Sequence, residues 1–246
     1  MDKKITKTTA EVVVMPALKM LKIRFPQTYI DEINDHIDKV IIPANKSFAD
    51  GLVGQLKQNK RSAQLTIPFD DDFGKKFKSD LEEIANLLIQ SENGFNRNAK
   101  ADAFSCWSNH AYSGDYNPFH SHGVGTPAGL SSFLYLKVPK CISTERDNTS
   151  LNNASGAADG WTQLIWGTNT RKELFELREQ EQEYVKPVVG LMLIFPHWLN
   201  HLVMPFFGKG ERRSLAANFN IRDTKDEVTK YMSAREKRLF EEKYND

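Results

Sequence analysis

The feature that most constrains the fold is the alternation of short apolar segments and turns between residues 103 and 222. Short segments rich in apolar, β-branched and aromatic residues alternate there with turns rich in Gly, Pro, Asn and Asp. These segments are AFSCWSNHAY, LSSFLYLKV, GWTQLIW, EYVKPVVGLMLIFP, HLVMPFF and RRSLAANFNIRD. Strands of this length and spacing are typical of antiparallel sheets. The pattern predicts an antiparallel barrel or jelly roll.

Helical patterns lie on both sides of this region. The first expected helix spans residues 26–41, where isoleucines recur at helical spacing. The second spans residues 70–94. Two more helices are expected at residues 171–184 and 224–242. The apolar stripe of the second helix is formed by Leu81, Ile84, Leu87 and Leu88.

The organisation expected from these elements is one α+β domain over residues 1–246, long enough to bury a sizeable core. An N-terminal flank of helices and one or two strands spans residues 1–102. The jelly-roll core spans residues 103–222, and the C-terminal helix lies within residues 223–246.

Composition excludes several classes of protein. A net charge of +1 provides no global field to recruit nucleic acid or an anionic membrane. The chain has two cysteines, Cys106 and Cys141, without a CxxC motif, so neither a disulfide scaffold nor a cysteine-rich zinc module is expected. No secretion signal and no apolar run of about 18 residues is present. We therefore expect a cytoplasmic protein.

The stretch YNPFHSHG places His120 and His122 two residues apart. In a strand, residues at this spacing point to the same face. Two imidazoles on one face form a site for a borderline metal such as Fe(II), Zn or Cu. The alternative is a pair of ordinary polar histidines at the edge of a loop.

A further histidine follows the apolar strand in GLMLIFPHWLNHLVMPF. His197 and His201 are four residues apart, but Trp198 stands where the zinc-protease motif HExxH requires glutamate. The strand-like flanks and Pro196 disfavour a helix, so His201 is the better ligand and His197 a residue of the turn. A buried histidine that is satisfied by hydrogen bonds is the alternative for His201.

The stretch GERRSLAANFNI alternates polar and apolar residues, as a strand with one polar face does. Arg212 shares a face with Ser214 and Asn218. An arginine inside a barrel is costly unless it meets an anion, and its planar fork suits a carboxylate. The alternation by itself leaves open whether Arg212 or Arg213 faces inward.

In this order, these motifs resemble the Fe(II)- and 2-oxoglutarate-dependent oxygenases, most closely an oxygenase branch near the prolyl hydroxylases that is common in tailed phages. The matching pieces are WSNHAYSGDYNPFHSH, LSSFLYLKVP, GLMLIFPHWLNHLVMPF and ERRSLAANFNI, which together extend from residue 107 to residue 221. The resemblance implies a double-stranded β-helix and hydroxylase-type dioxygenase activity that uses Fe(II), 2-oxoglutarate and O2.

The resemblance also assigns roles to individual residues. The metal ligands fall on His120, His122 and His201. The residues that bind the far carboxylate of 2-oxoglutarate fall on Arg212, Ser214 and Tyr135, while Asn109 and Asn218 fall on polar positions that face the cavity.

One departure concerns the second ligand, which is acidic in most of the family and is His122 here. Three neutral imidazoles leave the site more positive than two imidazoles and a carboxylate, so bound iron is a stronger Lewis acid. Water or Asp115 is the alternative third ligand.

Two other functions remain open from the sequence. A three-histidine cupin-type dioxygenase would not bind 2-oxoglutarate, and a non-catalytic jelly-roll module would not bind iron. For an enzyme, the near-neutral charge favours a peptide, a protein or a small molecule as substrate over nucleic acid.

Overall fold

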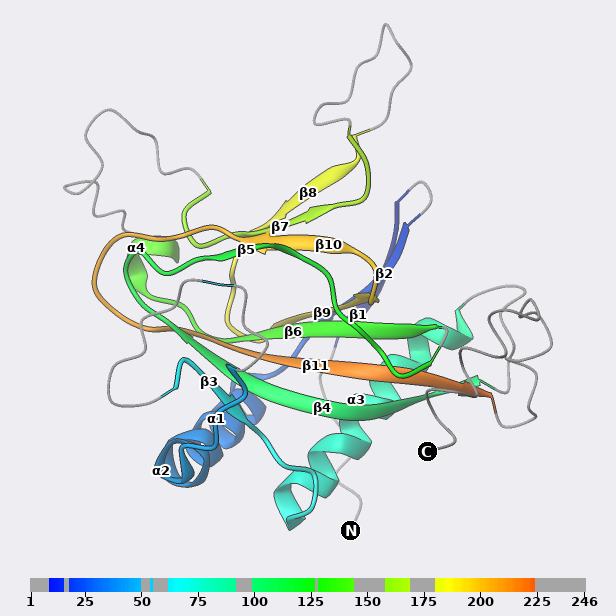
Figure 1. The fold of residues 1–246 in the computed structure, drawn as a ribbon, viewed down its shortest axis with the longest axis horizontal. Helices are drawn as coiled ribbons and strands as arrows, with labels where there is room; N and C mark the ends of the chain where they lie inside the picture. The colour runs from blue at the N-terminus through cyan, green and yellow to red at the C-terminus, as the bar shows by residue number, and fades with distance from the viewer. Residues whose placement is uncertain are drawn as a thin grey trace, which may run out of the picture.

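Two β-sheets face each other in the computed structural model, and helices cover the outer face of the larger sheet (Figure 1). The structure describes residues 9–15, 18–49, 54, 62–91, 99–126, 128–143, 158–168 and 180–223.

The larger sheet has seven strands in the order β1-β2-β9-β6-β11-β4-β3. Every neighbouring pair in this sheet is antiparallel. Its strands are β1 (Thr9–Met15), β2 (Leu18–Arg24), β3 (Gln64–Thr66), β4 (Ala99–Ala111), β6 (Gly129–Lys137), β9 (Leu191–Pro196) and β11 (Arg212–Asp223).

The smaller sheet has four strands in the order β5-β10-β7-β8. Between β4 and β11 the chain passes repeatedly from one sheet to the other, which is the winding of a double-stranded β-helix. The predicted jelly-roll core is confirmed. The strands of the smaller sheet are β5 (Asn117–His120), β7 (Thr162–Ile165), β8 (Gln182–Val185) and β10 (Asn200–Val203).

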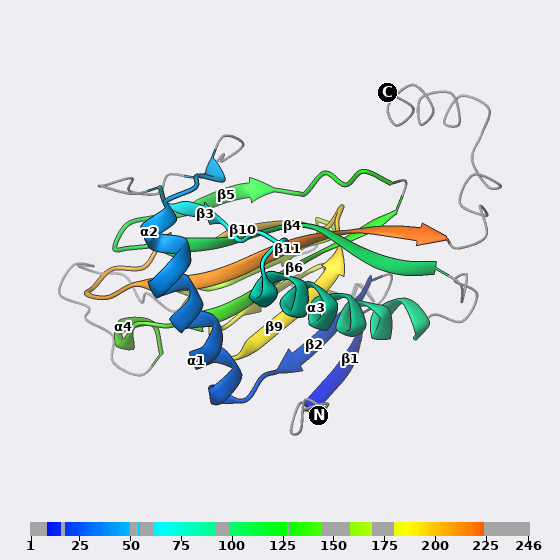
Figure 2. The same cartoon turned by 90° about the horizontal axis from the view of Figure 1, so that it is seen from below.

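Helices α1 and α3 lie across the outer face of the larger sheet (Figure 2). Both correspond to helices predicted from the sequence. Asp71 caps α3 by accepting a hydrogen bond from the backbone N–H of Gly74. The helical elements are α1 (Gln27–His36), the π-helical turn η1 (Ile37–Ile41), α2 (Ile42–Ala44), α3 (Asp72–Gln90) and α4 (Lys140–Ser143).

The structure corrects the apolar stripe of α3. Leu87 is 46% exposed, so its place in the predicted stripe was wrong. Phe77, Ala85 and Ile89 are buried instead and join Leu81, Ile84 and Leu88 in the core. Because 3.6 residues make a turn, the buried face extends by steps of three and four from Leu81 and Leu88, and Leu87 falls on its edge.

Strand alternation on β11 separates the core from the interior of the barrel. Leu215, Ala217 and Phe219 are fully buried in the hydrophobic core on the helical side of the sheet. Residues of the other parity face the space between the two sheets; these are Arg212, Ser214, Ala216 and Asn218. The polar face that the sequence predicts for this strand therefore lines a cavity.

Some expectations are corrected and others fall outside the described residues. Gln182–Tyr184 belong to β8, so the helix predicted over residues 171–184 does not extend that far. The rest of that helix from residue 171 to 179 and the helix expected at 224–242 lie outside the described residues. Within the described part of the chain, no helix is long and apolar enough to cross a membrane.

Candidate active site

A cavity of about 500 Å³ opens between the two sheets. Its walls come from β4 and β11 of the larger sheet and from β5 and β10 of the smaller one. Of the residues predicted for the site, those that line it are Asn109, His120, His122, His201, Arg212, Ser214 and Asn218.

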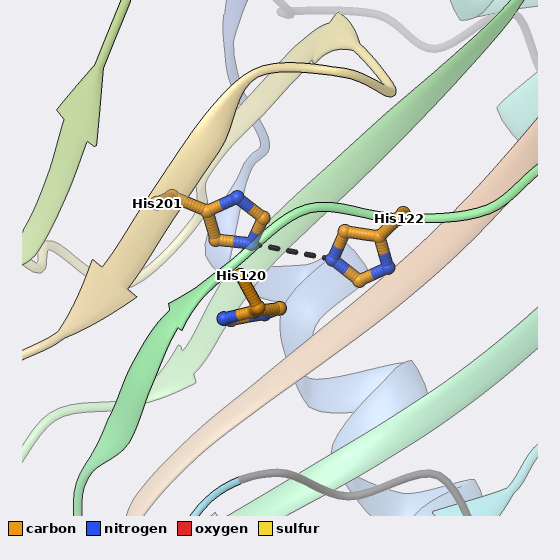
Figure 3. A group of neighbouring side chains, drawn as sticks. All are labelled: His120, His122 and His201. Carbon is orange, nitrogen blue, oxygen red and sulfur yellow. Dashed lines mark hydrogen bonds between the residues drawn. The ribbon is translucent and has the colours of Figure 1, made fainter.

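Three histidines converge at one wall of this cavity (Figure 3). His120 ends β5 and stands directly opposite His201 of β10, while His122 follows two residues after His120. One ring nitrogen of each lies within 4.8 Å of the other two. Residues from two separate segments of the chain therefore form a single cluster.

Backbone carbonyls fix the orientation of two of the rings. The Nδ1 atom of His120 is 2.6 Å from the carbonyl oxygen of Pro118, and Nδ1 of His201 is 3.0 Å from that of Leu199. A carbonyl only accepts, so each Nδ1 carries the proton and each Nε2 presents a lone pair. Such outer partners are typical of histidines that bind metals.

Burial keeps the three imidazoles neutral. Burial, and then the nearby His120 and His197, lower the pKa of His122 to about 4. Burial, with His120 and His122 close by, lowers the pKa of His201 to about 3. Burial also lowers the pKa of His120, although its bond to Pro118 opposes this. Neutral imidazole is the form that coordinates a metal.

The spacing of the ring nitrogens fits a metal ion. The Nε2 atoms of His122 and His201 are 3.2 Å apart, as the dashed line in Figure 3 marks. Metal–nitrogen bonds of about 2.1 Å at a right angle separate two ligand atoms by about 3.0 Å. The donor set of three nitrogens suits Fe(II), Zn or Cu.

Asp115, the alternative third ligand, also lines the cavity but lies outside the histidine cluster. Its carboxylate accepts a hydrogen bond from the backbone N–H of Tyr112 at 2.8 Å. His122 is the residue that the fold brings to His120 and His201. Its backbone is held by His197, whose Nδ1 lies 3.0 Å from the His122 oxygen and whose own oxygen accepts from the His122 N–H.

The two neighbouring arginines point to opposite faces of the larger sheet. Arg213 lies on the helical side, where its guanidinium is 2.7 Å from an Asp38 oxygen and 3.1 Å from a Glu211 oxygen. Arg212 lines the cavity and is only 4% exposed. The structure therefore decides which arginine faces inward.

Arg212 has neutral partners. It donates to the carbonyl of Gly160 at 3.1 Å and to the hydroxyl of Thr162 at 3.3 Å, and its guanidinium lies over the ring of Tyr135 at 5.1 Å. No carboxylate pairs with it among the described residues. Burial lowers the pKa of Arg212 from its usual value, against the influence of Tyr135. A buried cation of this kind favours an anionic ligand.

Polar residues form a row across the sheet beside Arg212. The strand register places Tyr135 opposite Ser214, Ser214 opposite Asn109, and Asn109 opposite Gln64. Tyr135 is fully buried, and its hydroxyl lies 2.7 Å from that of Thr162. Tyr135 therefore contacts the Arg212 guanidinium, whereas Ser214 reaches the cavity itself.

Asn218, the last of the predicted cavity residues, lies farther along β11. Its Oδ1 atom accepts a hydrogen bond from the hydroxyl of Ser131 at 2.9 Å. The pair is buried and supports the wall of the cavity.

Sequence reasoning missed Thr162, Gln64 and Trp107, which also line the cavity. Thr162 could have been found, because it shares the inward face of β7 with Leu164 in the segment TQLI. Gln64 lies in a strand of three residues, too short for a periodic pattern. Only the pairing of β3 with β4 brings it to the cavity.

Comparisons with known proteins agree with this fold. Residues 105–218 match the family model described as "Putative 2OG-Fe(II) oxygenase". This match includes the three histidines, Arg212 and Ser214. Among curated proteins, no sequence matches the chain.

Solved structures share the architecture at low sequence identity. SnoN, an α-ketoglutarate-dependent epimerase of nogalamycin biosynthesis, matches with a TM-score of 0.51 and 9% identity over 82% of this chain and 77% of its own. The carbocyclase SnoK from the same biosynthesis matches with a TM-score of 0.50 and 10% identity, over 87% of this chain and 86% of its own. A Pseudomonas putida prolyl-4-hydroxylase matches with a TM-score of 0.47 and 15% identity, over 80% of this chain and 89% of its own. The first two matches establish the double-stranded β-helix fold.

Proposed function

We propose that the chain is an Fe(II)- and 2-oxoglutarate-dependent oxygenase, the family whose model matches residues 105–218, and that its own residues serve this activity as follows. His120, His122 and His201 hold Fe(II), and Arg212 and Ser214 hold the far carboxylate of 2-oxoglutarate. The substrate is a peptide, a protein or a small molecule, and hydroxylation is the reaction.

The chemistry needs little from the protein beyond binding and orientation. When bound, Fe(II) and 2-oxoglutarate supply the oxidation of a C–H bond by O2, in which one oxygen atom enters the substrate and the other enters succinate as CO2 is released. The three histidines offer neutral nitrogens at a spacing that suits the metal. They occupy one wall of the cavity and leave its open space to the two substrates.

The observation that carries the proposal is the buried Arg212 without a carboxylate partner among the described residues. A guanidinium binds a carboxylate through two parallel N–H···O bonds, which a lysine could not provide. Ser214, on the same face of β11, adds a hydroxyl donor. Tyr135 acts through Arg212, because its ring and its bond to Thr162 hold the guanidinium in place. Asn109 and Asn218 contribute amides to the same wall.

A three-histidine dioxygenase that does not use 2-oxoglutarate has no use for this cation. The charge of Arg212 would then be buried at a cost of several kcal/mol without a ligand to offset it. The same argument weighs against a non-catalytic module.

Two further parts of the proposal concern organisation and location. We propose that residues 1–246 form one oxygenase domain, because β1 and β2 extend the sheet that carries β11. A reducing cytoplasm suits Cys106 and Cys141, which are not joined in a disulfide bond.

The test is an anaerobic titration of the Fe(II)-loaded protein with 2-oxoglutarate, followed by the visible charge-transfer band of the complex. We expect a band in wild type and its loss in Arg212→Ala. Arg222→Ala is the matched control, because Arg222 lies on the same strand but is exposed and pairs with Asp102. Iron binding without a band would indicate the dioxygenase alternative, and no iron binding would indicate the non-catalytic module.

A further inference from the structure

We propose that the side chains of Gln64 and Asn109 bind a peptide amide group of the substrate. This inference rests on the proposed function and identifies the class of substrate that the cavity accepts. It concerns the part of the cavity wall formed by β3 and β4, where Asn109 lies opposite Ser214 of the proposed 2-oxoglutarate site.

The two amides form a pair that is incomplete. The Nε2 atom of Gln64 donates to Oδ1 of Asn109 at 2.7 Å, across the pairing of β3 with β4. One such contact leaves one carbonyl oxygen and one NH2 group unused, whichever way the two amides are turned. No described residue bonds to either of them. Gln64 is 7% exposed, so what exposure remains lies toward the cavity that it lines.

The unused acceptor and the unused donor of this amide pair would together match a ligand that has a donor beside an acceptor. A peptide group carries one N–H and one C=O, and two hydrogen bonds to it would complete the amide pair. Neither unused group is among the fully buried unpaired atoms of the described residues, so both can reach the water of the cavity, and a peptide group that pairs with them would replace that water.

The position of the pair relative to the predicted iron site is consistent with a substrate site. Asn109 stands between Gln64 on one side and Ser214 on the other in the row across the sheet. Trp107 lies two residues before Asn109 on the same face of β4, and its ring is 5.7 Å from that of His122. Phe48 stacks on Trp107 at 4.5 Å. These rings provide an apolar wall between the amide pair and the histidine cluster.

The charge of the cavity favours a peptide over a nucleobase, which could also offer a donor beside an acceptor. Nucleic-acid binding depends on lysine and arginine contacts to phosphate. Arg212 is the only lysine or arginine among the described residues of the lining, and Asp115 adds an acidic group. A neutral peptide chain has no such requirement.

The experiment compares wild type with Gln64→Leu in the Fe(II)-loaded protein. Gln163→Leu is the matched control, because Gln163 is a strand glutamine of similar burial whose amide pairs with Gln182 outside the cavity. The charge-transfer band with 2-oxoglutarate is recorded first. Succinate formation is then measured alone, with a randomised library of N-acetylated, C-amidated tripeptides, and with random single-stranded oligonucleotides.

We expect the peptide library to increase succinate formation in wild type and in Gln163→Leu. In Gln64→Leu, the band remains, but the concentration of library needed for half stimulation rises about tenfold or more, as expected for the loss of a hydrogen bond to a buried group. A wild-type band without peptide stimulation would overturn the inference and leave the proposed function intact. Stimulation only by oligonucleotides, or equal stimulation of Gln64→Leu and wild type, would overturn it too. Absence of the band in wild type would refute the proposed function itself.

Discussion

Arg212 and Arg213 are neighbours on β11, yet replacing each by methionine should affect different properties of the protein. Arg213 is paired with Asp38 and Glu211 on the helical side of the sheet. Arg212 faces the cavity and has only neutral partners among the described residues. We expect Arg213→Met to lower the stability of the protein, and Arg212→Met to abolish 2-oxoglutarate binding with little change in stability.

The magnitudes follow from the contacts. Removing one partner of a buried ion pair costs about 3–5 kcal/mol, because the other charge is left behind. Glu211 is 17% exposed and keeps His110 and Lys137 beside it, whereas Asp38 is 44% exposed and solvent screens it. We therefore expect a loss of about 3 kcal/mol for Arg213→Met, near the lower limit.

For Arg212→Met, two effects oppose each other. The hydrogen bonds to Gly160 and Thr162 are lost, at roughly 1 kcal/mol each. The cost of burying the cation disappears as well, and hydrophobic replacement of buried charge is often neutral or stabilising by about 1–4 kcal/mol. We expect a net change within about 2 kcal/mol of zero.

Thermal unfolding of the two variants without 2-oxoglutarate provides the first assay. For a chain of this size, about 1 kcal/mol shifts Tm by roughly 2–4 °C, so Arg213→Met should melt about 6–12 °C below wild type. The second assay repeats the melt with Mn(II) and 2-oxoglutarate. Ligand at about 100 times its Kd stabilises by roughly 2.7 kcal/mol. The gain that 2-oxoglutarate adds to a melt with Mn(II) alone should appear in wild type and Arg213→Met and be absent in Arg212→Met.

Equal destabilisation by the two substitutions would refute the reasoning. It would mean that the charge of Arg212 is already compensated in the free protein, and the argument for an anionic ligand would fail. A gain in Tm with 2-oxoglutarate in Arg212→Met would refute the assignment of Arg212 as the carboxylate ligand.

Three other predictions concern the metal site and the helical side of the sheet. His201→Ala should eliminate stoichiometric binding of Co(II), measured by its visible absorption, because only two of the clustered nitrogens remain. His197→Ala should weaken Co(II) binding by less than the roughly 10–100-fold loss expected for a partner of a ligand's ring, because Nδ1 of His197 contacts the backbone oxygen of His122. His197→Asn should restore binding, since its amide can donate to the same oxygen; equal loss in both variants would contradict this. Burial opposes ionisation of Glu211, but hydrogen bonds to His110 and the charge of Arg213 outweigh it and lower its pKa to about 2 from 4.5. The stability that Glu211 contributes is therefore present above about pH 4.5 and lost as the pH falls toward 2. In urea unfolding from pH 6 to pH 3, the free energy of unfolding of wild type should approach that of Glu211→Gln. A constant difference between the two would contradict the assignment.

Most of the strands and two of the helices could be predicted because their signals are local. The segment RRSLAANFNI alternates polar and apolar residues, and alternation in a strand places every second side chain on one face. The isoleucines of residues 26–41 recur at helical spacing for the same kind of reason. Leu87 was placed wrongly, because a position at the edge of a helical stripe is buried only if a neighbouring element covers it.

The sequence identified seven residues that line the cavity, but not how they are arranged. The sequence by itself determined that Arg212 and Ser214 share a face and that His120 and His122 are close together. Only the tertiary structure decided that Arg212 rather than Arg213 faces the cavity, and that His122 rather than Asp115 joins His201. It alone brought Gln64 opposite Asn109. The physical reason is that the backbone geometry of a strand or helix repeats over a few residues, so the local sequence determines which side chains share a face. Which face meets the cavity depends on the pairing of strands that are distant in the chain.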